Sequence, residues 1–375
     1  MLFVSHTAHL GGAEIVLQRF LRRVKGFEYL ILIPAGPFSE SLAAAGVPYL
    51  LSRSLGNLHR DANVLWPFAF VYRFVLAQFE LLYWLRCLRP SVVQCNNYVS
   101  VVYTLLPALL LRTPIVWHMH DFVRPNRATR WLLRSMSTPV SKIIAVSDAV
   151  RGSLLDLGIP PDKVVTVYNA ADPPAQREAS GPEARKFEAF ASAFDLVLGV
   201  MGTISHLKGI HEILEALRLL VSEHGCNAGV MVAGQAATST DRHYLQELQE
   251  LVVRHGLEQR VRFLGQIADT DAFYRHLDAL VHYPVKPDSL PTVILEAIQS
   301  GCPVVAARIG GVPECLGEGR WGELVAPHDP RALARTLATG TRKRLGPDEL
   351  AAFRRRFSHE AKEARHLEIY RGILH

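Results

Sequence analysis

The side chains best suited to chemistry lie in two short loops, each between an apolar strand-like run and a helix-like segment. In the first loop, residues 202–209 (GTISHLKG), Lys208 stands directly before a helix expected over residues 210–222. An ammonium group near free helix amides is suited to binding an anion such as a diphosphate. A solvated loop lysine would give the same pattern, and the six-residue spacing of a Walker loop is absent.

The second loop opens residues 288–306 (DSLPTVILEAIQSGCPVVA). Pro291 suits the first turn of a helix, and Ser289 suits the cap before it. The free amides of Thr292 and Val293 would then face an anion. This stretch therefore predicts a second phosphate-binding helix start.

Two carboxylates flank this helix start. Asp288 lies in the loop, whereas Glu296 lies about two turns into the helix, so they would contact different parts of one ligand. They are thus not expected to act as a close acid pair. The alternative is purely structural, with Asp288 as a loop cap and Glu296 exposed on the helix.

A third turn, residues 9–14 (HLGGAE), follows the first strand-like run and leads into a helix expected over residues 15–24. Gly11 and Gly12 would let the backbone approach a ligand closely at that helix start. An ordinary strand-to-helix turn would look the same. No G-x-G-x-x-G pattern follows either this strand or LVLGVMG, which argues against a nicotinamide dehydrogenase.

No metal cofactor is expected. Residues 269–271 (DTD) resemble an acidic metal motif, but they precede a helix, where acidic caps are common. His118 and His120 alternate onto one face of a strand, yet the sequence offers no third ligand beside them.

The whole chain alternates short β-branched runs with longer amphipathic segments, which is typical of an α/β protein with doubly wound parallel sheets. Strands are predicted at LFVSH, YLILIP, VVQCN, IVWHM and KIIAVS, and again at LVLGVMG, GVMVAG, VRFLG, ALVHYP and PVVAA. We expect a first domain over residues 1–175, a linker over 176–194 and a second domain over 195–357. In the tail, Ala361, Ala364, Leu367 and residues 369–373 suggest the apolar face of a further helix.

Composition points to a cytoplasmic protein. The five cysteines form no CxxC pair, and residues 1–6 (MLFVSH) already read as a strand rather than a signal peptide. The net charge of +6 lies in the first half, because residues 1–178 hold 18 Lys and Arg against 11 Asp and Glu. Nothing in this scattered charge specifically indicates a nucleic-acid partner.

Residues 64–85 are apolar and long enough to cross a bilayer. Arg73 and Glu80 near the middle would each cost about 2–3 kcal/mol there, which argues against a spanning helix. The helix is either buried against a sheet or lies at a membrane surface, where its aromatic side chains would meet lipid headgroups. A peripheral membrane contact would then run through residues 64–89.

The order of the motifs resembles the retaining glycosyltransferases of family 4, also called group 1, which have the GT-B fold. GGAE (11–14), WHMHD (117–121), AVSDAV (145–150) and GIPPDKVVTVYNAAD (158–172) are followed by GTISHLKG (202–209), VRFLG (261–265), DSLPTVILEAIQSGCPVVA (288–306) and GGVPE (310–314). The resemblance covers nearly the whole chain. It implies two Rossmann-like domains facing each other across a cleft, with the C-terminal helix 358–375 crossing back onto the first.

The resemblance also implies roles for individual residues. Lys208 and the segment 290–293 (Leu290, Pro291, Thr292 and Val293) would hold the donor diphosphate, with Gly202 and Thr203 in the same loop and Gly11 and Gly12 closing from the other domain. Glu296 would bind the ribose, Gly265 the base through its backbone, and Asp288 and His120 the transferred sugar. Asp288 stands where the family has glutamate, and Thr203 where it has arginine.

The implied activity is metal-independent transfer of a sugar from a UDP- or GDP-sugar to a glycan or lipid-linked acceptor, in cell-envelope or exopolysaccharide synthesis. Two other activities remain open. One is a non-catalytic subunit that binds sugar nucleotides, which the departures at Asp288 and Thr203 prompt. The other is an epimerase or phosphorylase of the same fold.

Overall fold

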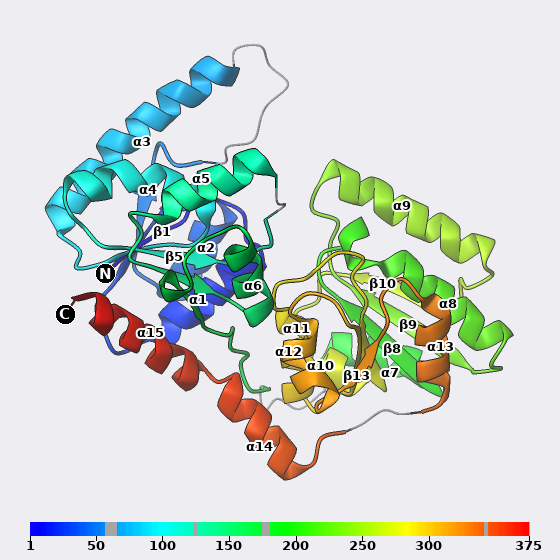
Figure 1. The fold of residues 1–375 in the computed structure, drawn as a ribbon. Helices are drawn as coiled ribbons and strands as arrows, with labels where there is room; N and C mark the ends of the chain where they lie inside the picture. The colour runs from blue at the N-terminus through cyan, green and yellow to red at the C-terminus, as the bar shows by residue number, and fades with distance from the viewer. Residues whose placement is uncertain (57–65, 124–125, 175–180, 341–343, 375) are drawn as a thin grey trace. The chain divides into compact units, whose positions relative to one another are not determined.

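The computed structural model describes residues 1–56, 66–123, 126–174, 181–340 and 344–374, without the side chains of residues 66–70. The chain forms two compact units. Unit 1 contains residues Met1–Ala170 and His359–His375, and unit 2 contains Ala171–Ser358. Each unit is built on a parallel β-sheet with helices packed around it (Figure 1).

Unit 1 contains a seven-stranded parallel sheet in the order β3-β2-β1-β4-β5-β6-β7. Its strands are β1 (Leu2–Val4), β2 (Leu30–Pro34), β3 (Tyr49–Ser52), β4 (Val93–Cys95), β5 (Ile115–Met119), β6 (Lys142–Ala145) and β7 (Val164–Thr166). Its helices are α1 (Gly12–Arg23), α2 (Pro37–Ala44), α3 (Trp66–Leu88), α4 (Tyr98–Leu110), α5 (Arg127–Ser137), α6 (Asp148–Asp156) and α15 (His359–Leu374), with a 3₁₀ turn at Pro161–Lys163.

Unit 2 contains a six-stranded parallel sheet in the order β10-β9-β8-β11-β12-β13. Its strands are β8 (Leu196–Met201), β9 (Ala228–Ala233), β10 (Val261–Gly265), β11 (Ala279–His282), β12 (Val304–Ala307) and β13 (Glu323–Val325). Its helices are α7 (Pro182–Ala191), α8 (Ile210–Ser222), α9 (Ser239–Arg254), α10 (Thr270–Arg275), α11 (Thr292–Gln299), α12 (Val312–Cys315), α13 (Pro330–Ala338) and α14 (Pro347–Arg356), with 3₁₀ turns at His206–Lys208 and Gly317–Gly319.

Apolar side chains on both faces of the sheets explain these strands. In unit 2, all residues of β9 and β11 are buried, as expected for central parallel strands covered by helices. Helix α8 adds Ile213, Leu217 and Leu220 to this core at helical spacing. The predicted class, an α/β protein with two parallel sheets, is confirmed.

Helix α7 falls inside the segment expected to be a linker, residues 176–194. Its Ala184, Phe187 and Phe190 are buried in unit 2, and the Phe187 ring meets Phe273 edge-on with centroids 5.8 Å apart. Of that segment, residues 176–180 lie outside the described residues. The compact structure of unit 2 therefore begins well before residue 195.

The apolar segment expected over residues 64–85 forms helix α3, of which residues 64 and 65 lie outside the described part. One face of α3, with Ala77, Leu81 and Leu85, is buried, while the opposite face is exposed. Among the described helices, none is both long and apolar enough to span a membrane.

Candidate functional site

The Lys208 loop and the Asp288 loop of unit 2 follow the C-terminal ends of two adjacent strands, β8 and β11. Ligands of doubly wound sheets bind at this edge. The amide of Val285 donates to the carbonyl of Leu207 at 3.0 Å and so ties the two loops together. The fold thus brings two predicted segments, 80 residues apart in the chain, to one place.

Within this site, Lys208 and Asp288 form an ion pair with 2.6 Å between Nζ and Oδ2. The lysine side chain is 31% exposed and the aspartate 17%, so the pair lies at the surface of the unit with its ammonium partly open to solvent. A partly exposed, positioned ammonium can still meet an anionic ligand.

His282 lies behind this pair at the end of β11. Its Nε2 is 3.3 Å from Oδ2 of Asp288. Burial lowers the pKa of His282 more than Asp288 raises it, so the imidazole is neutral at pH 7. Burial alone would raise the pKa of Asp288, but His282 and Lys208 lower it below its ordinary value. Asp288 is therefore an ionised, partly buried partner of Lys208.

Glycines let these loops approach one another. Gly209 has φ +64°, and a Cβ there would lie 2.1 Å from the carbonyl oxygen of Tyr283. A Cβ on Gly234 would lie 1.8 Å from the carbonyl oxygen of Gly202. Both positions are closed to any side chain because the neighbouring atoms belong to the backbone.

Gly310 supports the Asp288 loop in the same way. Its φ is +60°, a Cβ would lie 2.4 Å from the carbonyl oxygen of Asp288, and the next amide, Gly311, donates to that oxygen at 2.8 Å. The GGVPE motif thus holds the backbone that carries Asp288.

Gly310→Ala is expected to lower the free energy of unfolding by about 1 kcal/mol from backbone strain, and by a further 1–3 kcal/mol or so from the clash. Gly301→Ala is the matched control, since Gly301 has φ +74° but open space around its Cβ position. Thermal unfolding of both variants measures the difference. Equal losses would show that Gly310 does not hold the Asp288 backbone.

Helix α11 begins directly after this loop. Its N-cap is Pro291, without a side-chain cap, rather than the predicted Ser289, while Leu290 is buried. Thr292 and Val293 are the first two helical residues, so their N–H groups have no acceptor within the helix. They lie at the helix start, and their contact with an anion stays a prediction.

Glu296 lies one turn further along α11. The hydroxyl of Tyr274, itself only 1% exposed, lies 3.3 Å from Oε2 of Glu296. Tyr274 comes from α10 and was not predicted, because a single tyrosine outside the recognised motifs gives no sequence signal of its own. The same hydroxyl also lies 3.0 Å from Sδ of Met201 and 3.3 Å from the carbonyl oxygen of Val293, so Glu296 is one of three acceptors for its proton.

The remaining predicted residues of unit 2 are Gly202 and Thr203, in the Lys208 loop, and Gly265, at the end of β10. The amide of Gly202 donates to the carbonyl of Ala233 at 3.0 Å, and Gly265 accepts from the amide of Gly234 at 2.8 Å. Thr203 follows Gly202 and is exposed. The strand ends of β8, β9 and β10 are thus joined through their backbones.

Gly11, Gly12 and His120 belong to unit 1. The amide of Gly11 donates to Oε2 of Glu14 at 3.2 Å, and α1 begins at Gly12. His120 follows β5, is 6% exposed, and its Nε2 lies 3.1 Å from Oδ1 of Asn96. Burial, together with the nearby Lys362 and His366, lowers the pKa of His120 to about 3. His120 is therefore neutral at physiological pH.

The acidic motif at residues 269–271 acts as a helix cap, because Oδ1 of Asp269 accepts from the amide of Ala272 at 2.9 Å. The His118 and His120 rings lie 4.1 Å apart, centroid to centroid. Over the described ranges, no three His, Cys, Asp or Glu side chains are grouped so that they could hold a metal ion.

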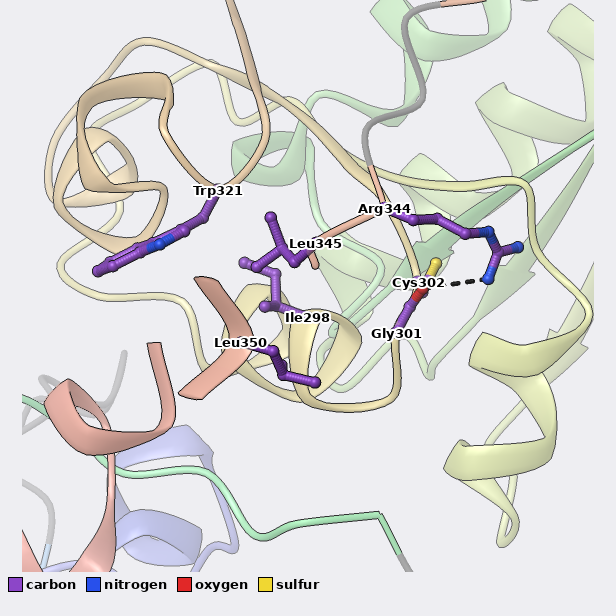
Figure 2. Close-up of a pocket in the computed structure, with 7 residues that line it drawn as sticks. All are labelled: Ile298, Gly301, Cys302, Trp321, Arg344, Leu345 and Leu350. Carbon is purple, nitrogen blue, oxygen red and sulfur yellow. Dashed lines mark hydrogen bonds between the residues drawn. The ribbon is translucent and has the colours of Figure 1, made fainter. Parts of the chain in front are cut away.

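A small cavity lies at the other end of α11, lined by Ile298, Gly301, Cys302, Trp321, Arg344, Leu345 and Leu350 (Figure 2). Its volume of about 20 Å³ has room for about one water molecule. Arg344 donates to the carbonyl oxygen of Gly301 at 3.3 Å across it. It is too small to hold a nucleotide sugar.

Two family models match the chain. The family model described as Glycosyltransferase Family 4 matches residues 10–174, and the model described as Glycosyl transferases group 1 matches residues 195–340. The chain belongs to this glycosyltransferase family.

This family 4 chain resembles two curated relatives in particular. The D-inositol 3-phosphate glycosyltransferase of Corynebacterium glutamicum (strain R) is 34% identical over 191 residues, 48% of this chain and 44% of the relative. The lipopolysaccharide core biosynthesis mannosyltransferase LpcC of Rhizobium leguminosarum bv. viciae is 29% identical over 244 residues, 63% of this chain and 61% of the relative. The matches thus span less than two thirds of either relative.

Solved structures match the family 4 chain over almost its full length. Anabaena HepE in complex with UDP and glucose has a TM-score of 0.79 at 22% identity, covering 98% of both chains. A glycosyltransferase from Rickettsia africae ESF-5 has a TM-score of 0.81 at 18% identity, covering 100% of this chain and 98% of the other. These likenesses show that the fold is GT-B, as predicted.

Proposed function

We propose that the chain transfers a sugar from a nucleoside diphosphate sugar to a hydroxyl group of an acceptor, with retention of the anomeric configuration. The observation that carries this proposal is the Lys208–Asp288 pair, with 2.6 Å between its charged atoms. Asp288 lies four residues before Thr292, the first residue of α11. Membership of the glycosyltransferase family supports it. The similar fold of HepE, solved with UDP and glucose, supports a UDP-sugar as donor, with a GDP-sugar as the alternative.

In this proposal, unit 2 binds the donor. Lys208 and the amides of Thr292 and Val293 hold the diphosphate, because each offers N–H groups or positive charge to an anion. Glu296, whose Oε2 lies 3.3 Å from the Tyr274 hydroxyl, accepts hydrogen bonds from the ribose hydroxyls. The backbone at Gly265 contacts the base.

Asp288 and His120 are proposed to contact the transferred sugar. Asp288 is ionised and accepts hydrogen bonds. His120 is neutral, so one ring nitrogen can donate and the other accept. Unit 1, which carries His120, is proposed to bind the acceptor.

Breaking the anomeric bond builds negative charge on the leaving diphosphate and positive charge on the sugar ring. A fixed ammonium and helix amides stabilise that charge more in the transition state than in the ground state. We propose that the acceptor hydroxyl attacks from the face that the diphosphate leaves, and that the diphosphate takes its proton. These cationic and amide groups would serve in place of a metal ion.

The acceptor is proposed to be a glycan or a lipid-linked sugar of the cell envelope or an exopolysaccharide. The likeness to the lipopolysaccharide core mannosyltransferase LpcC supports this class. We place the reaction in the cytoplasm, at the inner membrane face when the acceptor is lipid-linked. The five cysteines are all free thiols, which fits a reducing compartment.

Thermal unfolding in the presence of UDP, GDP, ADP, dTDP and NAD tests the proposed donor. One nucleoside diphosphate at 100 times its Kd should raise the free energy of unfolding by about 2.7 kcal/mol. The stabilisation should persist in EDTA and fall in Lys208→Met. A response to NAD alone, or to none of the five, would contradict the proposal. Binding without acceptor-dependent release of nucleotide would instead indicate a non-catalytic subunit.

A further inference from the structure

Helix α3 exposes an apolar face on the outside of unit 1. Its exposed apolar side chains are Val71, Tyr72, Val75, Leu76, Phe79, Tyr83 and Leu88. Tyr72 and Phe79 are each 67% exposed. Tyr72, Leu76, Phe79 and Tyr83 recur every three or four residues, so they share one side of the helix, opposite its buried side.

Two neighbouring helices continue this pattern. Helix α4 packs against both α3 and α5, and the three helices lie side by side in unit 1 (Figure 1). In α4, Leu106, Leu109 and Leu110 are exposed at helical spacing. In α5, Trp131 is 71% exposed. Large apolar groups exposed on adjoining helices indicate a surface that something covers.

The charges on the same helices are almost all positive. Helix α5 (RATRWLLRSMS) has three arginines and no acid, and α4 has no charged residue. In α3 the single acid is Glu80, which accepts from the hydroxyl of Ser52 at 2.8 Å and from the amide of Ser54 at 3.1 Å. The arginine side chains at 73, 86, 127, 130 and 134 are exposed. The one acid therefore faces the protein, while the arginines face solvent.

We propose that this surface, the arginine–aromatic face, docks onto a membrane containing anionic lipid. It consists of the exposed apolar and arginine side chains of α3, α4 and α5 named above. Tyrosine, tryptophan and phenylalanine lie well at the boundary between headgroups and acyl chains, and arginines pair with lipid phosphates. The positive charge selects an anionic bilayer over a second copy of this face, because two such faces would repel each other.

Co-sedimentation of the full chain with vesicles tests this proposal. Binding is expected to vesicles of phosphatidylcholine mixed with phosphatidylglycerol, and to be weak with phosphatidylcholine alone. High salt should weaken it. Because each arginine contributes about five-fold to binding at an anionic surface, Arg127→Gln with Arg130→Gln should weaken binding by about 25-fold.

The apolar part of the face is tested by Phe79→Ser with Trp131→Ser, which should weaken binding by about ten-fold or more. The matched control is Val253→Ser with Arg254→Gln, an exposed pair on α9 of unit 2, which should leave binding unchanged. All these positions are exposed, and thermal unfolding checks that each variant is folded. Size-exclusion chromatography checks for self-association.

Three results would overturn the proposal. The first is no binding to either vesicle, and the second is equal binding to both. The third is a dimer that Phe79→Ser with Trp131→Ser converts to a monomer, which would make the face an interface between copies. None of these results depends on sugar transfer, so the proposed function would stand or fall separately.

Discussion

Lys208→Met is expected to lower the turnover rate of sugar transfer by about 10²- to 10³-fold. The ammonium is held 2.6 Å from Asp288, a partly buried carboxylate that His282 helps to keep ionised. A cation fixed in this way does not have to reorganise as charge grows on the leaving diphosphate. Release of nucleoside diphosphate from saturating donor, in the presence of acceptor, measures the loss.

Lys286→Met is the control for this experiment. Lys286 is exposed and lies two residues before Asp288, so its replacement removes the same charge from the same loop without touching the ion pair. Its turnover rate should stay close to that of the unchanged chain. If both variants lose activity equally, a general positive field rather than Lys208 itself supports the reaction. If neither does, the assignment of Lys208 is wrong.

The sequence predicted most of the strands because central parallel strands are apolar on both faces. Three strands were not predicted: β3, β7 and β13, with sequences YLLS, VVT and ELV. Each lies at an edge of its sheet and pairs with one neighbour only. With only three or four residues each, they are too short for their hydrophobic pattern to be told from that of a loop.

The site could be predicted residue by residue but not as an arrangement. The motifs identified Lys208 and Asp288 separately, with the aspartate assigned to the sugar. Their direct contact depends on two loops that the sheet order brings together, and spacing along the chain does not reveal it. His282 was included only as part of the strand ALVHYP. Its position behind Asp288 follows from which face of β11 it occupies.

The buried face of the C-terminal helix α15 was predicted only in part. Of the predicted apolar face, Ile369 and Tyr370 are buried as expected, but Ala361 and Ala364 are exposed. In the first half of the helix the buried residues include Lys362 and His366 instead. Charged and polar residues normally mark the solvent side of a helix, so the pattern was wrong for the first two turns of this helix. The polar face is turned towards the interior of unit 1, where the hydroxyl of Tyr370 donates to Oε1 of Gln94 at 2.6 Å.

Lys362 is the most unusual group on that face. It is 4% exposed, its Nζ lies 5.4 Å from the centre of the Phe20 ring, and burial lowers its pKa to about 7. An unfolded lysine has a pKa near 10.4. Between these values the unfolded chain binds more protons than the folded chain, so the free energy of unfolding rises with pH. For Lys362 this rise is about 2 kcal/mol between pH 7 and pH 9.

Lys362→Met is therefore expected to be more stable than the unchanged chain at pH 7, and the difference should shrink by about 2 kcal/mol by pH 9. Calorimetric unfolding at pH 7, 8 and 9 measures it. Lys25→Met serves as the control, since Lys25 is an exposed lysine of the same unit and should give no such trend. A difference that is the same at all three pH values would mean that Lys362 titrates as an exposed lysine does.

The buried histidines determine how the free energy of unfolding changes at acidic pH. Burial lowers the pKa of both His120 and His366 to about 3, far below the unfolded value near 6.5. Stability is therefore lost as the pH falls below 6.5, because these histidines bind protons in the unfolded chain but not in the folded chain. In Lys362→Met this acid loss should be smaller, since the lysine's charge helps to lower both pKa values. The buried Lys362 on α15 thus destabilises the fold, but its charge helps to keep His120 neutral. In the neutral state His120 can both donate and accept a hydrogen bond.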